Sequence, residues 1–196
     1  MKVAVIKYNA GNIFSVECAL RRIGVEPIVT DDPVLINSAD KVIFPGVGEA
    51  SSAMVYLRER GLDKVIAGLK QPLLGICIGL QLLCRHSEEG NTDCIGIFNT
   101  DVKKFDAEDS GMKIPHMGWN TVESTVESNP LIPDDGRYVY YVHGYYAPVC
   151  RETIAITDYI NPFSAMMRKD NFFATQFHPE KSGDVGESIL KNFMSL

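Results

Sequence analysis

The first half of the chain alternates between short apolar runs and segments with apolar residues at helical spacing. Four compact runs predict strands at Val3–Ile6, Pro27–Thr30, Lys41–Phe44 and Leu73–Ile76. Helical spacing, acidic or proline starts and glycine ends predict helices over residues 12–23, 31–35, 51–60, 62–70 and 79–86. Regular alternation of strand and helix indicates a largely parallel sheet with helices on both faces.

The second half has a different pattern. Short strand-like segments, separated by Gly, Pro, Asn and Asp, lie at residues 102–105, 120–122, 137–142, 153–156, 165–168 and 172–176. They predict an antiparallel extension of the sheet, followed by a helix over residues 186–194. We find no repeat or linker that would divide the 196 residues, so we expect one α/β domain spanning residues 1–196.

Composition changes this picture little but excludes several classes of protein. The formal net charge is -6, and no basic patch offsets it, which argues against a nucleic-acid-binding protein. The longest apolar runs are far shorter than a membrane span. The chain begins with a strand pattern and lacks the long apolar core of a signal peptide, so we expect a cytoplasmic protein.

The cysteines and histidines give no sign of a metal or disulfide framework. There are five cysteines, an odd number, and none forms a C-x-x-C pair. The four histidines lack zinc-ligand spacing, and neither a P-loop nor G-x-G-x-x-G is present. We therefore expect no metal and no cofactor.

One cysteine lies in a sequence that suits a nucleophile. Gly75, Cys77 and Gly79 form G-x-C-x-G between a predicted strand and a predicted helix, the pattern of a nucleophile elbow with sulfur as nucleophile. A tight strand-to-helix turn brings neighbouring backbone close, so Cβ atoms must be absent on both sides. The start of the helix favours a thiolate and offers backbone N–H groups to an oxyanion. The alternative is a buried cysteine in a glycine-rich turn.

A base and an orienting carboxylate follow one strand near the end of the chain. His178 and Glu180 flank Pro179, which favours extended backbone and places the two side chains on one side. A carboxylate beside the imidazole fixes its tautomer and supports the imidazolium. Alone, His178 would also fit a strand-end histidine in an ordinary hydrogen bond.

These two segments together resemble the class I, triad-type glutamine amidotransferases. The segment G-I-C-I-G-L-Q at 75–81 and the segment Q-F-H-P-E at 176–180 lie about 100 residues apart, as in that family. The resemblance spans nearly the whole chain. It implies a triad of Cys77, His178 and Glu180, a γ-glutamyl thioester on Cys77, and release of ammonia and glutamate.

Further segments narrow the resemblance to one branch of this family, the glutaminase subunits of imidazole glycerol phosphate synthases. These segments are Y-N-A-G-N at 8–12, P-G-V-G at 45–48, P-H-M-G-W-N at 115–120, Y-V-H-G-Y-Y at 141–146 and K-S at 181–182. The resemblance implies a heterodimer with a cyclase subunit, which uses the ammonia to make imidazole glycerol phosphate and AICAR in histidine biosynthesis. It also implies low activity of the isolated chain and activation by the partner's ligand through a flip of the Gly46–Val47 peptide.

The resemblance assigns the remaining site residues. Backbone N–H groups for the oxyanion would come from Gly46, Val47 and Ile78. The substrate would contact Gly48, Gln81, Glu89, His143, Gly144 and Tyr145. The partner would contact Asn12, Met117, Trp119, Asn120, Tyr140 and Lys181. Alternatives remain for two of these: Glu89 could be a solvated acid in a charged run, and Trp119 a core aromatic.

Two positions depart from the family pattern. Asn9 stands where glycine is usual, and Gly144 where Ser or Thr is usual.

Three rival functions stay open. The first rival is the glutaminase of another amidotransferase, such as the anthranilate or pyridoxal phosphate type. The second is a cysteine peptidase or γ-glutamyl hydrolase of similar fold, and the third is an inactive interaction module.

Overall fold

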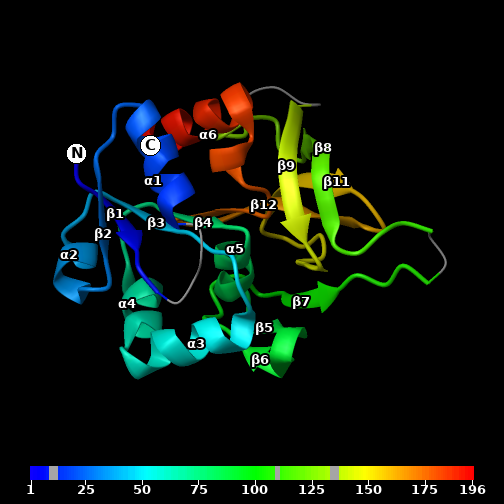
Figure 1. Ribbon diagram of the computed structural model, residues 1–196, viewed down its shortest axis with the longest axis horizontal. Helices are drawn as coiled ribbons and strands as arrows, with labels where there is room; N and C mark the ends of the chain where they lie inside the picture. The colour runs from blue at the N-terminus through cyan, green and yellow to red at the C-terminus, as the bar shows by residue number, and fades with distance from the viewer. Residues whose placement is uncertain (9–12, 109–110, 133–136) are drawn as a thin grey trace.

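One mixed β-sheet forms the centre of the molecule (Figure 1). The computed structural model describes residues 1–8, 13–108, 111–132 and 137–196. In these ranges nine strands lie in the order β2-β1-β3-β4-β13-β12-β11-β8-β9. They are β1 Val3–Ile6, β2 Pro27–Thr30, β3 Lys41–Phe44, β4 Leu73–Ile76, β8 His116–Ser124, β9 Arg137–His143, β11 Thr153–Asp158, β12 Pro162–Lys169 and β13 Phe172–Thr175.

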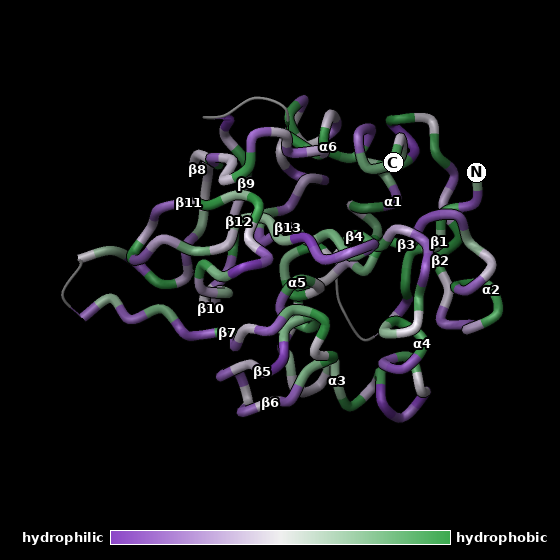
Figure 2. The backbone as a smooth tube through the Cα atoms, turned by 180° about the vertical axis from the view of Figure 1, so that it is seen from behind, coloured by the Kyte–Doolittle hydropathy of each residue, from purple (hydrophilic) through white to green (hydrophobic). Residues whose placement is uncertain are grey.

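The five strands from β2 to β13 run parallel. The strands β1, β3, β4 and β13 are buried along their whole length, as expected for strands covered on both faces. Strand β13 pairs with β4 in a register that places Thr175 opposite Ile76. The two strands lie side by side in the middle of the sheet (Figure 2). The segments that follow them therefore emerge next to each other, although they are about 100 residues apart in sequence.

Helices cover both faces of this parallel part. In Figure 1, α1 and α6 lie on one side of the sheet, and α3, α4 and α5 on the other. Two clusters of buried apolar side chains, one under each set of helices, form the core. The helices are α1 Ile13–Arg22, α2 Pro33–Asn37, α3 Ala50–Glu59, α4 Leu62–Gly68, α5 Ile78–Leu83 and α6 Gly183–Ser195, with 3-10 turns η1 Glu89–Asn91 and η2 Pro179–Lys181.

The antiparallel part extends the sheet and brings β9 toward the ends of the parallel strands. Strands β12, β11, β8 and β9 pair antiparallel in that order after β13. A second sheet has the order β10-β7-β5-β6 and is largely hydrophilic (Figure 2). Its strands are β5 His86–Ser87, β6 Thr92–Asp93, β7 Asp101–Lys104 and β10 Tyr145–Tyr146. The expected α/β class and antiparallel extension are confirmed.

Several predicted elements differ in extent from the structure. The strand expected over residues 165–168 spans Pro162–Lys169, and the helix expected over residues 186–194 spans Gly183–Ser195. The helix expected over residues 79–86 ends at Leu83, because Arg85 N–H bonds to the carbonyl of Thr100 and the chain turns into β5. The strand expected over residues 120–122 runs from His116 to Ser124, because it pairs along its length with β9. Within the described ranges, no helix combines the length and apolarity needed to cross a bilayer.

Candidate active site

Cys77 occupies a strained turn between β4 and α5. Its backbone has φ 54° and ψ -104°, a region that costs a residue with a side chain about 1–3 kcal/mol. The neighbouring glycines explain how the turn fits: a Cβ on Gly79 would collide with the carbonyl oxygen of Phe44, and one on Gly75 would lie 2.9 Å from the Gly79 backbone. Cys77 N–H donates to the carbonyl of Thr175 at 2.7 Å, which ties the turn to β13. The tight strand-to-helix turn expected at Cys77 is therefore present.

His178 and Glu180 form a buried pair beside this turn. His178 Nδ1 lies 2.7 Å from Glu180 Oε1, so Nδ1–H donates to the carboxylate and Nε2 is left to exchange a proton. His178 Nε2 has no hydrogen-bond partner among the described residues, but Cys77 is close enough to act on the imidazole through its charge. Burial lowers the pKa of His178, yet the negative charge of Cys77 and then Glu180 outweigh it and raise the pKa to about 10. At neutral pH this favours the imidazolium form of His178.

The expected reason for the pairing of His178 with Glu180 needs correction. His178 is extended, but Pro179 opens the 3-10 turn η2, so Glu180 does not lie on an extended segment. The turn folds the carboxylate back onto the imidazole. The backbone of this segment is fixed to β9, because His178 N–H donates to the carbonyl of Tyr140 at 2.9 Å and Tyr140 N–H donates to Ser182 Oγ at 3.0 Å.

Cys77 lines a cavity of about 290 Å³. Its walls come from the β3–α3 loop, α5, η1 and the end of β9, which lie far apart in sequence. The residues that line it are Val47, Gly48, Cys77, Ile78, Gln81, Glu89, Pro115, Val142, His143, Gly144 and Tyr145. All six residues expected to contact the substrate are among them, and so are Val47 and Ile78. A cavity of this size suits a small ligand.

The loop expected to stabilise the oxyanion packs tightly against the nucleophile turn. Gly46 is buried, and a Cβ there would collide with the Ile78 side chain and the Tyr8 hydroxyl. Tyr8 donates this hydroxyl to the carbonyl of Pro45, and burial followed by the charge of Cys77 raises the pKa of Tyr8. Only glycine at position 46 lets this loop approach α5, whose first residue, Ile78, presents a backbone N–H at the helix start.

Glu89 lines the cavity and is half-buried. Its Oε2 accepts a hydrogen bond from Ala50 N–H at 2.8 Å, at the start of α3. Burial raises the pKa of Glu89 although this hydrogen bond opposes the change, and the charge of Glu49 adds to the rise. The position therefore does not fit a fully solvated acid. A carboxylate here can bind the ammonium group of an amino acid.

The two departures from the family pattern differ in what the structure says about them. Asn9 lies outside the described residues. Gly144 lines the cavity, and a Cβ built on it would meet only Ile114, at 3.7 Å. A larger side chain would fit at this position, so glycine is not required by packing. Gly144 contributes its carbonyl, which accepts from Phe105 N–H at 3.1 Å.

Of the residues expected at a partner interface, four lie together at the surface, where Met117, Trp119 and Lys181 are exposed and Tyr140 is half-buried. Met117 and Trp119 on β8 are 67% and 56% exposed, so Trp119 is not a core residue. Trp119 lies opposite Tyr140 of β9, with ring centroids 6.1 Å apart, and the Lys181 ammonium lies 5.9 Å from the Tyr140 ring. We call Met117, Trp119, Tyr140 and Lys181 the β8–β9 patch. Asn12 lies outside the described residues.

Asn120 does not lie with this patch. Side chains alternate along a strand, and Asn120 shares the other side of β8 with His116. Its amide donates to the carbonyl of Asp158 at 2.9 Å and to His116 Nε2 at 3.3 Å. The structure thus gives Asn120 internal partners. His116, in turn, lies 3.0 Å from His143 on the cavity wall.

The sequence reasoning missed several residues at the site. Pro115 and Val142 line the cavity, and Gln176 contacts Cys77 from the side of β13. All three lie in segments that carry the family resemblance: Pro115 opens P-H-M-G-W-N, Val142 lies in Y-V-H-G-Y-Y, and Gln176 opens Q-F-H-P-E.

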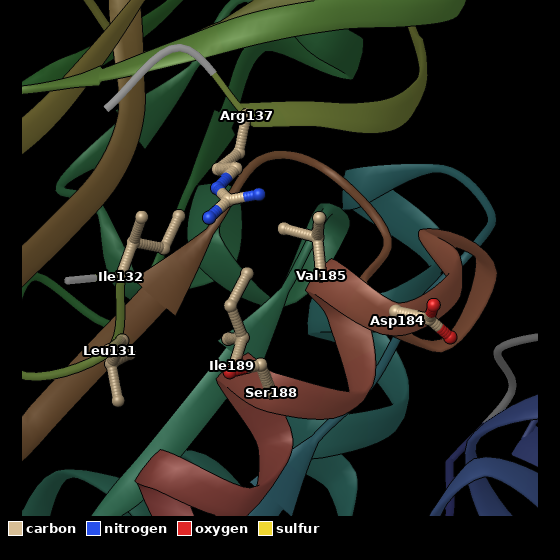
Figure 3. A pocket seen from close by; sticks show the side chains of 7 residues that line it. All are labelled: Leu131, Ile132, Arg137, Asp184, Val185, Ser188 and Ile189. Carbon is tan, nitrogen blue, oxygen red and sulfur yellow. The ribbon is translucent and has the colours of Figure 1, made fainter. Parts of the chain in front are cut away.

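Another cavity, of about 170 Å³, lies between the chain before β9 and the start of α6 (Figure 3). Its lining residues are Leu131, Ile132, Arg137, Asp184, Val185, Ser188 and Ile189. None of these is a cysteine or histidine, so this cavity lacks the nucleophile–base pair found at Cys77.

A cysteine in a strained turn, a buried histidine–carboxylate pair and a small adjoining cavity form the arrangement that cysteine-dependent amide hydrolases and transferases use. The family model for "Glutamine amidotransferase class-I" matches residues 5–196. The chain therefore belongs to the class I glutamine amidotransferase family.

Sequence relatives are more specific. The chain is 60% identical to "Imidazole glycerol phosphate synthase subunit HisH" of Bacteroides fragilis (strain YCH46), covering all of both chains. It is 43% identical to the protein of the same name from Idiomarina loihiensis, covering 100% of this chain and 98% of the relative. A solved glutamine amidotransferase structure superimposes with a TM-score of 0.75 at 17% identity, covering 100% of this chain and 98% of the other. The structural likeness supports the fold alone.

Proposed function

We propose that this chain is the glutaminase subunit of an imidazole glycerol phosphate synthase and hydrolyses L-glutamine through Cys77. The observation that carries the proposal is the convergence of Cys77, which lines the cavity, with the buried His178–Glu180 pair, whose Nδ1 and Oε1 lie 2.7 Å apart. Relatives named HisH match this chain over nearly their whole length, which supports the assignment to an imidazole glycerol phosphate synthase rather than to another amidotransferase.

The chemistry is an acyl transfer in two halves. The Cys77 thiolate attacks the side-chain carbonyl carbon of glutamine, and backbone N–H groups near Val47 and Ile78 bind the oxyanion. The C–N bond breaks as His178 imidazolium gives its proton to the departing ammonia, leaving a thioester. His178, now neutral, takes a proton from water; the hydroxide adds to the thioester, and the C–S bond breaks with its electron pair returning to sulfur. Glutamate leaves, and Glu180 stabilises the imidazolium throughout.

The substrate orientation follows from the cavity walls. Glu89 and Gln81 would bind the amino-acid end of glutamine, while Gly48, His143, Gly144 and Tyr145 would enclose the rest. The ammonia would pass to a cyclase subunit bound as a heterodimer at the β8–β9 patch. Binding of the cyclase ligand would activate the glutaminase through the Gly46–Val47 peptide. All five cysteines are free, which is usual in a reducing compartment and supports a cytoplasmic location.

The decisive experiment measures glutamate release by the purified chain alone, with the cyclase subunit, and with the cyclase subunit and its ligand. Only the last mixture should turn over glutamine rapidly. Complementation of a histidine auxotroph that lacks its glutaminase subunit should then restore growth.

The same assays separate the rival functions. Growth rescue of an anthranilate or pyridoxal phosphate auxotroph, but not of the histidine auxotroph, would favour another amidotransferase. Faster cleavage of γ-glutamyl peptides than of glutamine would favour a hydrolase. Failure of a glutamine-analogue electrophile to label Cys77 would favour an inactive module.

Replacing Trp119 with alanine should weaken binding of the cyclase subunit. An exposed tryptophan beside Met117 and Tyr140 has the character of an interface anchor, and truncating such an anchor costs about 2 kcal/mol or more, roughly a 30-fold loss of affinity. Calorimetric titration checks the affinity, and the ratio of glutamate to synthase product should rise because ammonia escapes. Val149→Ala is the matched control, since Val149 is also exposed (51%) but outside the patch. An unchanged affinity and ratio would refute the assignment of this surface.

A further inference from the structure

Gln176 is a buried side chain in contact with the reacting sulfur, and the mechanism above gives it no role. It follows β13 directly and is 0% exposed. Its Nε2 lies 3.7 Å from Cys77 Sγ, within the range of a hydrogen bond to sulfur. Its Oε1 accepts a hydrogen bond from Gln81 Nε2 at 3.2 Å. Both ends of the carboxamide are therefore engaged, and one end is on the nucleophile.

The orientation of the Gln176 amide follows from its neighbours. Gln81 Nε2 also donates to the carbonyl of Tyr145 at 3.0 Å, and a carbonyl can only accept. The Gln81 atom that faces both partners must then be nitrogen, so the Gln176 atom that it meets must be oxygen. The nitrogen of Gln176 is left to face Cys77 Sγ. An N–H donor at this point is therefore required by the hydrogen-bond pattern.

The same reasoning assigns the hydrogen-bond donors and acceptors as far as strand β8. His143 Nδ1 lies 2.8 Å from the carbonyl of Tyr145, so Nδ1 carries the proton. In a neutral imidazole Nε2 then accepts, which makes His116 Nδ1 the donor across their 3.0 Å contact. His116 Nε2 accepts from the Asn120 amide at 3.3 Å. Burial lowers the pKa of His116 to about 4 and that of His143 to about 3, so both rings are neutral near pH 7.

The surroundings hold these groups in place. The His116 ring is stacked between Tyr141 and Tyr159, with centroid distances of 4.7 and 3.9 Å and interplanar angles of 22° and 20°. The Tyr145 carbonyl accepts from both His143 and Gln81, so it joins the histidine pair to the glutamine pair. The result is a continuous set of hydrogen bonds from Asn120 to the sulfur, with every donor and acceptor specified.

We propose that Gln176 is a further catalytic residue for glutamine hydrolysis, whose carboxamide N–H donates to the Cys77 sulfur when it carries negative charge. A hydrogen bond to an ionised acceptor is stronger than one to a neutral acceptor. The N–H thus favours the thiolate before attack and again when the C–S bond of the thioester breaks and sulfur regains its electron pair. Gln81 positions Gln176 by donating a hydrogen bond from its Nε2 to Gln176 Oε1.

The test follows the pH dependence of Cys77 alkylation by iodoacetamide in the full chain, read by mass spectrometry of the peptide that contains Cys77. The midpoint belongs to the coupled Cys77–His178 pair, so only differences between variants are interpreted. Gln176→Met keeps the size of the side chain but removes the donor. It should move the midpoint upward by about one pH unit, given the usual strength of a hydrogen bond to a charged group.

A second variant and a matched control make the test independent of folding. Gln176→Glu keeps an oxygen for Gln81 but places an oxygen toward the sulfur, so it should move the midpoint in the same direction and further. Gln71→Met applies the same change to a glutamine remote from the sulfur, whose amide donates to the carbonyl of Ile36, and should leave the profile unchanged. Near-UV circular dichroism selects the variants that retain native packing. Coincident midpoints in either folded Gln176 variant and the wild type would overturn the proposal.

The role in turnover rests on the proposed function and has its own readout. In the activated complex with the cyclase subunit, Gln176→Met should lower kcat at least about tenfold. The KM for glutamine should change little, because the contact is to sulfur. If the wild-type complex releases no glutamate, the proposed glutaminase function fails, whereas the alkylation profiles still decide whether Gln176 acts on Cys77. A change in KM alone would assign Gln176 to cavity shape and overturn the catalytic role.

Discussion

Replacing Cys77 with alanine should abolish glutamine hydrolysis while leaving synthesis from added ammonia intact. Cys77 lines the cavity beside a buried histidine–carboxylate pair, and loss of a nucleophile in such a setting lowers turnover by at least about 10³-fold. Product formation from ammonium salts needs only the cyclase chemistry, so it should persist in the complex. Glutamate release and product formation are measured with each nitrogen source.

The control for this prediction is Cys150→Ala, the same change at a free cysteine that does not line the cavity. It should retain both activities. Co-elution with the cyclase subunit shows that each variant still assembles. Glutamine hydrolysis by Cys77→Ala within tenfold of wild type would exclude the thioester mechanism.

Replacing Gly79 with alanine should destabilise the protein strongly. A methyl group at this position would collide with the carbonyl oxygen of Phe44 at the end of β3. Because the colliding atom belongs to the backbone, no flexible side chain can move aside to make room. Overpacking of this kind costs about 1–3 kcal/mol, and more where backbone must shift. The same shift would displace the Cys77 turn, so the remaining folded protein should also lose activity. Urea unfolding measures the change in free energy.

Gly68→Ala is the matched control for Gly79→Ala. Gly68 lies at the exposed end of α4, has no atom within 4 Å of a built Cβ, and is not at positive φ. Alanine there should be neutral or stabilise by up to about 1 kcal/mol, as expected for glycine in a helix. Equal changes in the free energy of unfolding for the two substitutions would show that the close approach of α5 to β3 leaves room for a methyl group at position 79.

The residues that could be predicted from sequence are those with a periodic or local signal. The parallel strands were placed correctly because each is a compact apolar run, and four of them, β1, β3, β4 and β13, are buried along their whole length. The turn at Cys77 was predicted because two glycines at fixed offsets report a steric requirement that is local. His178 and Glu180 were paired because they are two residues apart, although the 3-10 turn that brings them together was not foreseen.

What could not be predicted depends on tertiary pairing. His116 was not expected in a strand. The apolar Met117 and Trp119 of this segment face outward rather than into the core, and its extent as a strand follows from its pairing with β9. The hydrogen-bonded set that includes His116 and Gln176 joins residues from β8, β9, α5 and the end of β13. Buried polar side chains of this kind give no hydrophobic pattern, so only their arrangement in space shows what they contact.

Strand β9 is the last strand of the large sheet, and an uncovered last strand can pair with other chains and seed aggregation. Here the backbone of Tyr140 on its outer side is capped by the segment that carries His178 and Ser182. The segment that carries His178 therefore also protects an edge strand of the large sheet from pairing with another chain. Damage to it would cost solubility together with activity, so inactive variants from this region need to be checked for self-association.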